Sequence, residues 1–146
     1  MDTLLVSACL LGFDCKYNGG NNALPPEALA ALRSRFRLIP ICPELAGGLP
    51  VPREPSERRG ERVISRGGRD VTLEFERGAA VALRLAERYG AKRALFKANS
   101  PSCGSGRIYD GSFTGTITRG NGVAAAYLMQ QKIEVYGAFS ELIDRI

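Results

Sequence analysis

The chain has 146 residues, the usual size of one domain, with 45% hydrophobic and 24% charged residues, as in an ordinary globular protein. It contains no apolar run of about 18 residues and does not begin with a basic segment followed by an apolar one, so we expect no membrane span, no signal peptide and a reducing cytoplasm. The net charge of +5 only weakly favours anionic partners, and the absence of histidine excludes His-ligated zinc and catalysis by Ser-His-Asp or Cys-His groups.

Hydrophobic periodicity and breaker residues divide the chain into alternating strands and helices. In chain order, we expect a strand at 3–8, a helix from 25 to about 35, a strand at 37–41 and a long helix that Asp70 or Thr72 caps and that runs to about Tyr89, where Gly90 ends it. A strand at 93–97, a helix at 123–131, a strand at 132–136 and a final helical turn capped by Ser140 follow. This alternation predicts a single three-layer α/β domain over residues 1–146, with a mainly parallel, Rossmann-like sheet.

Three of the connections between these elements have a recognisable composition. Residues 45–53 are predicted to be a loop. Residues 54–68 are charged and rich in breaker residues, which is typical of a lid, a binding loop or a disordered segment, with Val63-Ile64 as a possible short edge strand. A turn signal at Asp110-Gly111 predicts a small hairpin or an ordered loop over residues 108–119.

Chemically reactive side chains follow the ends of three predicted strands. Cys9 follows the first strand, Cys42-Pro43-Glu44 follows the second, and the loop 97–106 follows the third. Because the carboxyl ends of parallel strands meet at one edge of a sheet, we expect these groups to share one crevice. With no histidine available, Glu44 is a candidate general base.

The four cysteines, Cys9, Cys15, Cys42 and Cys103, leave four interpretations open. Structural zinc usually shows paired C-x2-4-C hooks and dithiol exchange usually shows C-x-x-C, and the chain has neither pattern. Cysteines that only pack in the core are a third interpretation. An iron–sulfur cluster tolerates irregular spacing, prefers thiolates and suits a site whose other groups are Ser, Glu, Asn, Lys and glycine amides.

Short motifs occur in a set order between residue 4 and about residue 136. They are Ser7-Ala8-Cys9-Leu10-Leu11-Gly12, Cys15-Lys16-Tyr17-Asn18-Gly19, Cys42-Pro43-Glu44, Gly47-Gly48-Leu49, Pro52-Arg53, Gly68-Arg69-Asp70-Val71-Thr72, Ser100-Pro101-Ser102-Cys103-Gly104 and Tyr109-Asp110-Gly111. Together they strongly resemble the small bacterial thiouracil desulfidase family. The resemblance implies a [4Fe-4S] cluster that three cysteines hold, with the fourth iron open for the substrate's sulfur.

The resemblance also implies a catalytic glutamate and a catalytic serine beside the cluster, which map onto Glu44 and Ser100. It does not identify the three ligands. Cys9 and Cys103 are the first choices, and Cys15 is favoured over Cys42 as the third because it shares a loop with Cys9. Further candidates for substrate contact are Lys97, Arg53, Tyr17 and Tyr109.

The resulting hypothesis is a non-redox desulfuration of thiolated pyrimidines such as thiouracil, which gives the oxo-pyrimidine and hydrosulfide. The pyrimidine's sulfur binds the open iron, Glu44 takes a proton from water, and Ser100 helps to orient that water. One alternative is desulfuration of thiolated tRNA bases. Another is a non-catalytic protein that binds zinc or an iron–sulfur cluster.

Overall fold

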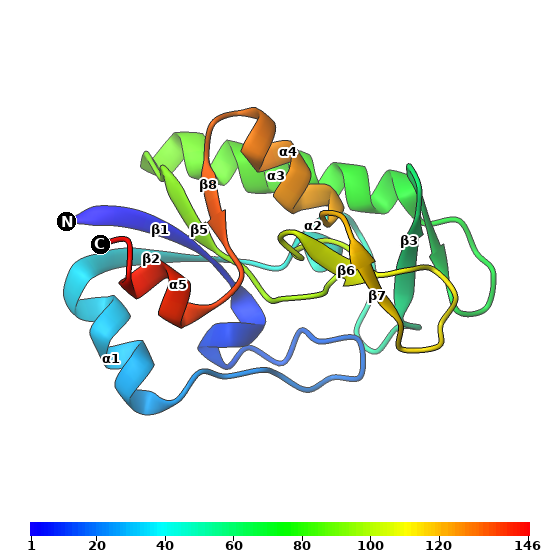
Figure 1. Ribbon diagram of the computed structural model, residues 1–146, viewed down its shortest axis with the longest axis horizontal. Coiled ribbons are helices and arrows are strands. Elements are labelled where there is room, and N and C mark those ends of the chain that lie inside the picture. Colours follow the sequence, from blue (N-terminus) through cyan, green and yellow to red (C-terminus); the bar gives the residue numbers. More distant parts are fainter.

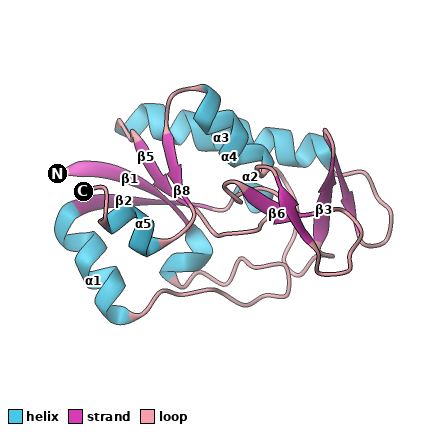
Figure 2. Ribbon diagram, in the orientation of Figure 1, coloured by secondary structure: helices cyan, strands magenta, loops and turns pink.

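The computed structural model describes residues 1–146, and at its centre lies a four-stranded sheet (Figures 1 and 2). The strands are arranged in the order β2-β1-β5-β8. Their bounds are Asp2–Ser7 for β1, Phe36–Ile41 for β2, Arg93–Leu95 for β5 and Glu134–Tyr136 for β8. Every neighbouring pair is parallel, so the predicted parallel sheet is confirmed.

Helices cover both faces of the sheet, as Figure 1 shows. The helices α3 (Thr72–Tyr89) and α4 (Val123–Gln130) lie on one face, and α1 (Pro26–Arg35) and α5 (Phe139–Ile143) lie on the other. Successive side chains of β1 pack on opposite faces of the sheet, because the side chains of a strand point alternately to the two sides. Leu5 belongs to the α3/α4 core, whereas Leu4 and Val6 belong to the α1/α5 core. None of the helices is both long enough and apolar enough to cross a bilayer.

The connections hold more regular structure than expected. The helix α2 (Pro43–Ala46) follows β2 and includes the first two residues of the predicted loop 45–53. Residues 54–68 contain an antiparallel hairpin, β3 (Ser56–Arg59) with β4 (Arg62–Ser65), which forms its own sheet and adds no strand to the central one. This hairpin is ordered because Val63 is fully buried in a small apolar cluster. A second hairpin, β6 (Arg107–Tyr109) with β7 (Ile117–Arg119), confirms the prediction for residues 108–119.

Two predicted helix caps are wrong. Val71 precedes α3 as its N-cap, and the Asp70 carboxylate instead accepts hydrogen bonds from the N–H and the hydroxyl of Thr72, at 2.9 and 2.6 Å. Ser140 lies inside α5, whose N-cap is Ala138. Gly90 ends α3 as predicted, in the left-handed conformation at φ 69° that glycine adopts without strain.

The carboxyl ends of three strands lie at one edge of the sheet. Ser7 of β1 is opposite Ile41 of β2, and Val6 is opposite Leu95 of β5. The N–H of Lys97 donates to the Ser7 hydroxyl at 2.9 Å, which ties the loop after β5 to the end of β1. Since the chain crosses from β1 to β2 over one face and from β2 to β5 over the other, a crevice is expected at this edge.

Candidate active site

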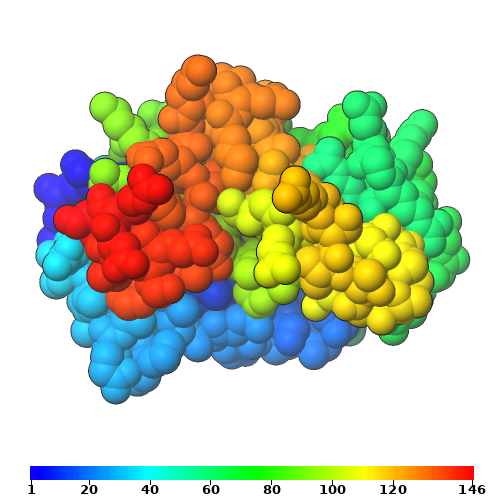
Figure 3. All heavy atoms as spheres, in the orientation of Figure 1, coloured from blue at the N-terminus to red at the C-terminus, as the bar shows by residue number.

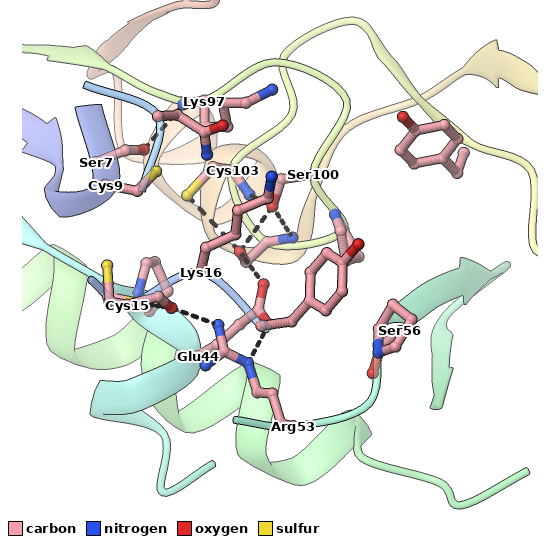
Figure 4. Close-up of a pocket in the computed structure, with 18 of the residues that line it drawn as sticks. Ser7, Cys9, Cys15, Lys16, Glu44, Arg53, Ser56, Lys97, Ser100 and Cys103 are labelled. Carbon is pink, nitrogen blue, oxygen red and sulfur yellow. Dashed lines mark hydrogen bonds and ion pairs between the residues drawn. The ribbon is translucent and has the colours of Figure 1, made fainter. Parts of the chain in front are cut away.

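A cavity of about 430 Å³ opens at this edge of the sheet. All ten residues predicted for the site line it: Cys9, Cys15, Cys42, Cys103, Glu44, Ser100, Lys97, Arg53, Tyr17 and Tyr109. Figure 4 shows side chains from the start, the middle and the second half of the chain gathered around it. The fold therefore brings the predicted residues together, while their chemical roles stay predictions.

Four separate segments deliver the four thiols. Cys9 lies in a 3-10 helix, η1 (Ala8–Leu11), Cys15 lies in the loop that follows it, Cys42 precedes α2, and Cys103 lies in the loop after β5. All four are free thiols. Cys15 and Cys103 are buried, while Cys9 and Cys42 are half-buried. The Cys42 Sγ lies 3.8 Å from the carbonyl oxygen of Cys15, so these two segments are in direct contact.

Burial controls the protonation of three of these thiols. Removal from water raises the pKa of Cys103 to about 12, and it is also the largest cause that raises the pKa of Cys15 to about 12 and the pKa of Cys9 above its usual value. The neighbouring Cys42 raises the pKa of both Cys15 and Cys9 further. Thiols of this kind carry their protons at neutral pH, so metal binding there releases protons.

The donor set fits an iron–sulfur cluster better than a single metal ion. No three His, Cys, Asp or Glu side chains converge closely enough to hold one ion. A cluster distributes its ligands differently, because each cysteine binds a different iron atom and the thiols lie around the cluster. Four thiols around one cavity, in a chain without histidine, form the soft donor set that such clusters use.

Glu44, in α2, is held at both carboxylate oxygens. The Arg53 Nε donates to Oε1 at 2.9 Å, and the Ser102 hydroxyl donates to Oε2 at 3.0 Å (Figure 4). The Arg53 side chain is only 7% exposed and also donates to the carbonyls of Pro50 and Cys15, at 3.1 and 2.9 Å. Arg53 thus joins Glu44 to the loop that carries Cys15, and its role in substrate contact stays a prediction.

The position of Glu44 depends on how closely α2 approaches α3. A Cβ atom on Gly78 of α3 would lie 1.8 Å from the carbonyl oxygen of Pro43, and one on Gly47 would lie 1.8 Å from the carbonyl oxygen of Glu74. Only glycine lets the two backbones come this near. These two glycines therefore set the place of the helix that carries Glu44.

Sequence reasoning missed Ser102, which is 2% exposed and lines the cavity. Its Oγ lies 3.0 Å from Glu44 Oε2, 3.0 Å from the Ser100 Oγ and 3.6 Å from the Cys103 Sγ. The Ser100 Oγ accepts the N–H groups of Ser102 and Cys103, both at 3.1 Å. The only signal for Ser102 in the sequence was its place between Ser100 and Cys103 in one motif.

Glu57, on β3, is a second residue that the sequence did not single out. This carboxylate is 8% exposed and lines the cavity, and its Oε1 accepts the N–H groups of Gly111 and Phe113, at 2.9 and 3.1 Å. Arg59 of the same strand donates to the carbonyl of Gly111 at 2.8 Å. Phe113 also lines the cavity, with an unusual positive φ of 58°. The first hairpin, green in Figure 3, thereby holds the loop of the second, yellow, as an outer wall of the cavity.

Comparison with known proteins agrees with this geometry. Residues 4–138 match the 2-thiouracil desulfurase family. The chain belongs to this family. A solved structure, that of the [4Fe-4S]-dependent thiouracil desulfidase TudS, is 42% identical to the chain and superposes with a TM-score of 0.91, covering 100% of both chains. The uncharacterized protein YbbK of Bacillus subtilis (strain 168) is 41% identical over 137 residues, with coverage of 87% of this chain and 89% of YbbK. The predicted family and the Rossmann-like fold are therefore confirmed.

Proposed function

We propose that this chain desulfurates thiouracil with a [4Fe-4S] cluster that three of its cysteines hold. Membership of the desulfurase family makes it an enzyme, with thiouracil as the substrate that the family name and TudS indicate. The observation that supports the proposed site most strongly is the convergence of four free thiols, Glu44 and Ser100 on one cavity. The free thiols also agree with our expectation of a reducing cytoplasm.

Cys9, Cys103 and one of Cys15 and Cys42 are the proposed ligands. Cys15 and Cys42 touch each other, so either can supply the third thiolate without a change of fold. When bound, the cluster supplies an open iron that acts as a Lewis acid toward the thiocarbonyl sulfur. The remaining chemistry falls to the side chains of the chain.

Glu44 is the proposed general base. Arg53 and Ser102 each occupy one lone pair of its two oxygens, and a carboxylate has about four such acceptor positions, so it can still accept a proton from water. The water oxygen forms the new C–O bond while its proton passes to Glu44, and the C–S bond then breaks with its electron pair on sulfur. The remaining hydroxyl proton passes to the departing sulfur, which leaves as hydrosulfide, and the oxygen stays on the ring as the carbonyl. Glu44 then returns its proton to solvent, and no net electron transfer is required.

Tyr17, Tyr109 and Lys97 are the proposed substrate contacts. The two tyrosines are 39% and 37% exposed although they line the cavity, so their rings are available to a pyrimidine. The Lys97 Nζ makes one hydrogen bond, to the carbonyl of Ala98 at 3.1 Å, and an ammonium has three donors, so it retains donors for a ring oxygen or an anionic substituent. These contacts would orient the ring so that its sulfur faces the thiols.

The decisive experiment is anaerobic reconstitution followed by incubation with thiouracil. We expect bound iron and sulfide, and release of uracil and hydrosulfide. Cys9→Ser and Cys103→Ser should abolish stable cluster binding, and of Cys15→Ser and Cys42→Ser one should abolish it and the other spare it. Ser105→Ala, a change in the same loop as Cys103 but outside the cavity lining, is the control that should keep the cluster.

Two outcomes would contradict the proposal. A full cluster without hydrosulfide release would leave a non-catalytic iron–sulfur protein. A full cluster in the Cys103→Ser protein would show that the ligand set is wrong.

Desulfuration of thiolated tRNA bases is the second candidate, and the charge of the cavity favours it. The lining contains four cations, Lys16, Arg53, Arg66 and Lys97, against the two carboxylates Glu44 and Glu57. If tRNA is the substrate, its affinity should fall steeply with salt concentration, because each phosphate contact releases counterions. Turnover of free thiouracil without salt-dependent tRNA binding would exclude this candidate.

A further inference from the structure

Ser102 lies at the centre of a chain of hydrogen bonds that connects the two proposed catalytic groups. Ser100 and Glu44 have no direct hydrogen bond, and each lies 3.0 Å from the Ser102 Oγ. The residue is 2% exposed, so water does not compete for its hydroxyl. Ser102 is 58 positions from Glu44 in the sequence and two positions from Ser100.

Counting hydrogens gives this chain a direction. A serine hydroxyl has one proton to donate and two lone pairs to accept with. Both lone pairs of the Ser100 Oγ are used, because it accepts the N–H groups of Ser102 and Cys103. Ser100 must therefore donate to Ser102. Ser102 in turn donates its single proton to the Glu44 carboxylate, which at 3.0 Å is nearer and a stronger acceptor than the Cys103 Sγ at 3.6 Å.

We propose that Ser102 is a positioning residue that aims the Glu44 carboxylate and couples it to Ser100. The inference rests on the proposed function, since it assigns Ser102 a part in the reaction of that same site. Arg53 holds one oxygen of Glu44 and Ser102 holds the other, so the carboxylate plane is defined by two donors from different segments. Without the Ser102 hydroxyl, only the hydrogen bond from Arg53 holds the Glu44 carboxylate, which can then rotate. The Ser100 hydroxyl also loses the Ser102 oxygen that accepts its proton.

Kinetics of the cluster-loaded Ser102→Ala protein test this role. We expect kcat with thiouracil to fall about 10- to 100-fold, as for the loss of a hydrogen bond to a charged group, and KM to change by no more than roughly twofold. Ser102→Thr, which retains the hydroxyl, should recover most of the lost rate. Ser105→Ala removes a hydroxyl from the same loop, one that donates to the carbonyl of Val135 at 3.3 Å, and should behave as the wild type.

Two further measurements separate positioning from a general structural effect. In a Glu44→Gln background, Ser102→Ala should add little further loss, because a residue that acts through Glu44 has nothing left to position. A crystal structure of the Ser102→Ala protein should show the Glu44 carboxylate turned away from its wild-type orientation, with iron content unchanged in the reconstituted protein.

The outcomes are distinguishable. A wild-type kcat in the Ser102→Ala protein overturns the proposal, and so does loss of its cluster. The proposal also fails if the rate loss of Ser102→Ala adds fully to the rate loss of Glu44→Gln while the Glu44 carboxylate keeps its orientation. If the wild-type holoenzyme itself releases no hydrosulfide, the proposed function fails, and the orientation of Glu44 in the variant crystal alone decides whether Ser102 positions it.

Discussion

Glu44 divides its two carboxylate oxygens between a guanidinium nine positions along the chain and a hydroxyl 58 positions along the chain. The Arg53 Nε lies 2.9 Å from Oε1, and the Ser102 Oγ lies 3.0 Å from Oε2. The Glu44 side chain is 15% exposed and lines the cavity. A base held in this way meets its water in one geometry, which is what proton abstraction requires.

At the residue scale, Glu44→Gln should leave the cluster intact and suppress turnover by about 10²–10⁴-fold, the usual loss when a general base is removed. Glutamine is nearly isosteric and can still accept from Arg53, but its amide cannot take a proton from water. Hydrosulfide and uracil release measures the effect, and iron content with circular dichroism confirms that the variant is loaded and folded. Glu61→Gln, which alters an exposed carboxylate at the tip of the β3–β4 hairpin, is the matched control.

A near-normal rate in the loaded Glu44→Gln protein would remove the base role from Glu44. The nucleophile would then need no protein base, and the serine pair would be left with a positioning role only.

At the scale of elements, the contact between α2 and α3 decides where the base sits. The short helix α2 packs on α3 through backbone atoms, as the approach of Gly78 to the Pro43 carbonyl shows. No side chain stands between the two helices at this point, so any added atom must push them apart. The catalytic geometry is therefore sensitive to a residue that does not line the cavity.

Gly78→Ala should destabilise the protein by about 1–3 kcal/mol, although alanine in a helix interior normally stabilises by about 1 kcal/mol relative to glycine. The reversed sign follows from the clash, since the new Cβ would lie 1.8 Å from the Pro43 carbonyl oxygen. Urea unfolding measures the free energy, and kcat should fall as α2 moves. Arg77→Ala, an exposed neighbour in α3, should change stability by no more than about 0.5 kcal/mol. A more stable Gly78→Ala protein would show that α2 is free to shift without cost.

At the scale of the whole molecule, the proposed cluster joins segments that the fold already brings together. The two cores on either side of the sheet contain fully buried side chains such as Leu4, Phe96 and Leu128, none of which lines the cavity. Cys103 is a member of the α3/α4 core and Cys9 packs against the α1/α5 core, but all the other members of both cores are apolar side chains that carry no thiol, so both cores can form without the cluster. The cluster would add a cross-link between η1 and the loops that hold the other cysteines.

We expect the cluster-free protein to remain folded and the loaded protein to unfold at a temperature several degrees higher, because a group that binds only the native state stabilises it by mass action. Circular dichroism during heating, under anaerobic conditions, measures both midpoints. The Cys103→Ser protein should show no such rise after reconstitution. The prediction fails if the cluster-free protein is unfolded, or if the cluster-free and fully loaded proteins have equal unfolding temperatures.

The sequence by itself determined the parallel α/β fold, the end of α3 at Gly90 and the strand ends at which the thiols lie. These features are local, because the period of apolar residues and the conformational freedom of glycine act within a few positions of the chain. Parallel pairing then requires strand ends of one direction to share an edge, so even the approximate place of the cavity followed from local patterns. Single polar residues near helix starts were weaker signals: the caps expected at Asp70 or Thr72 and at Ser140 were wrong.

Only the tertiary structure decided how the cavity's groups are connected. Ser102 donates to Glu44 across 58 positions, Glu57 holds Gly111 across 54, and Arg53 reaches the carbonyl of Cys15 across 38. The hairpin of residues 56–65 likewise depends on the burial of Val63 in a cluster with Leu49, Val71 and Phe75. A hydrogen bond or an apolar contact depends on distances of a few ångströms in space, and sequence separation carries no information about such distances until the chain has folded.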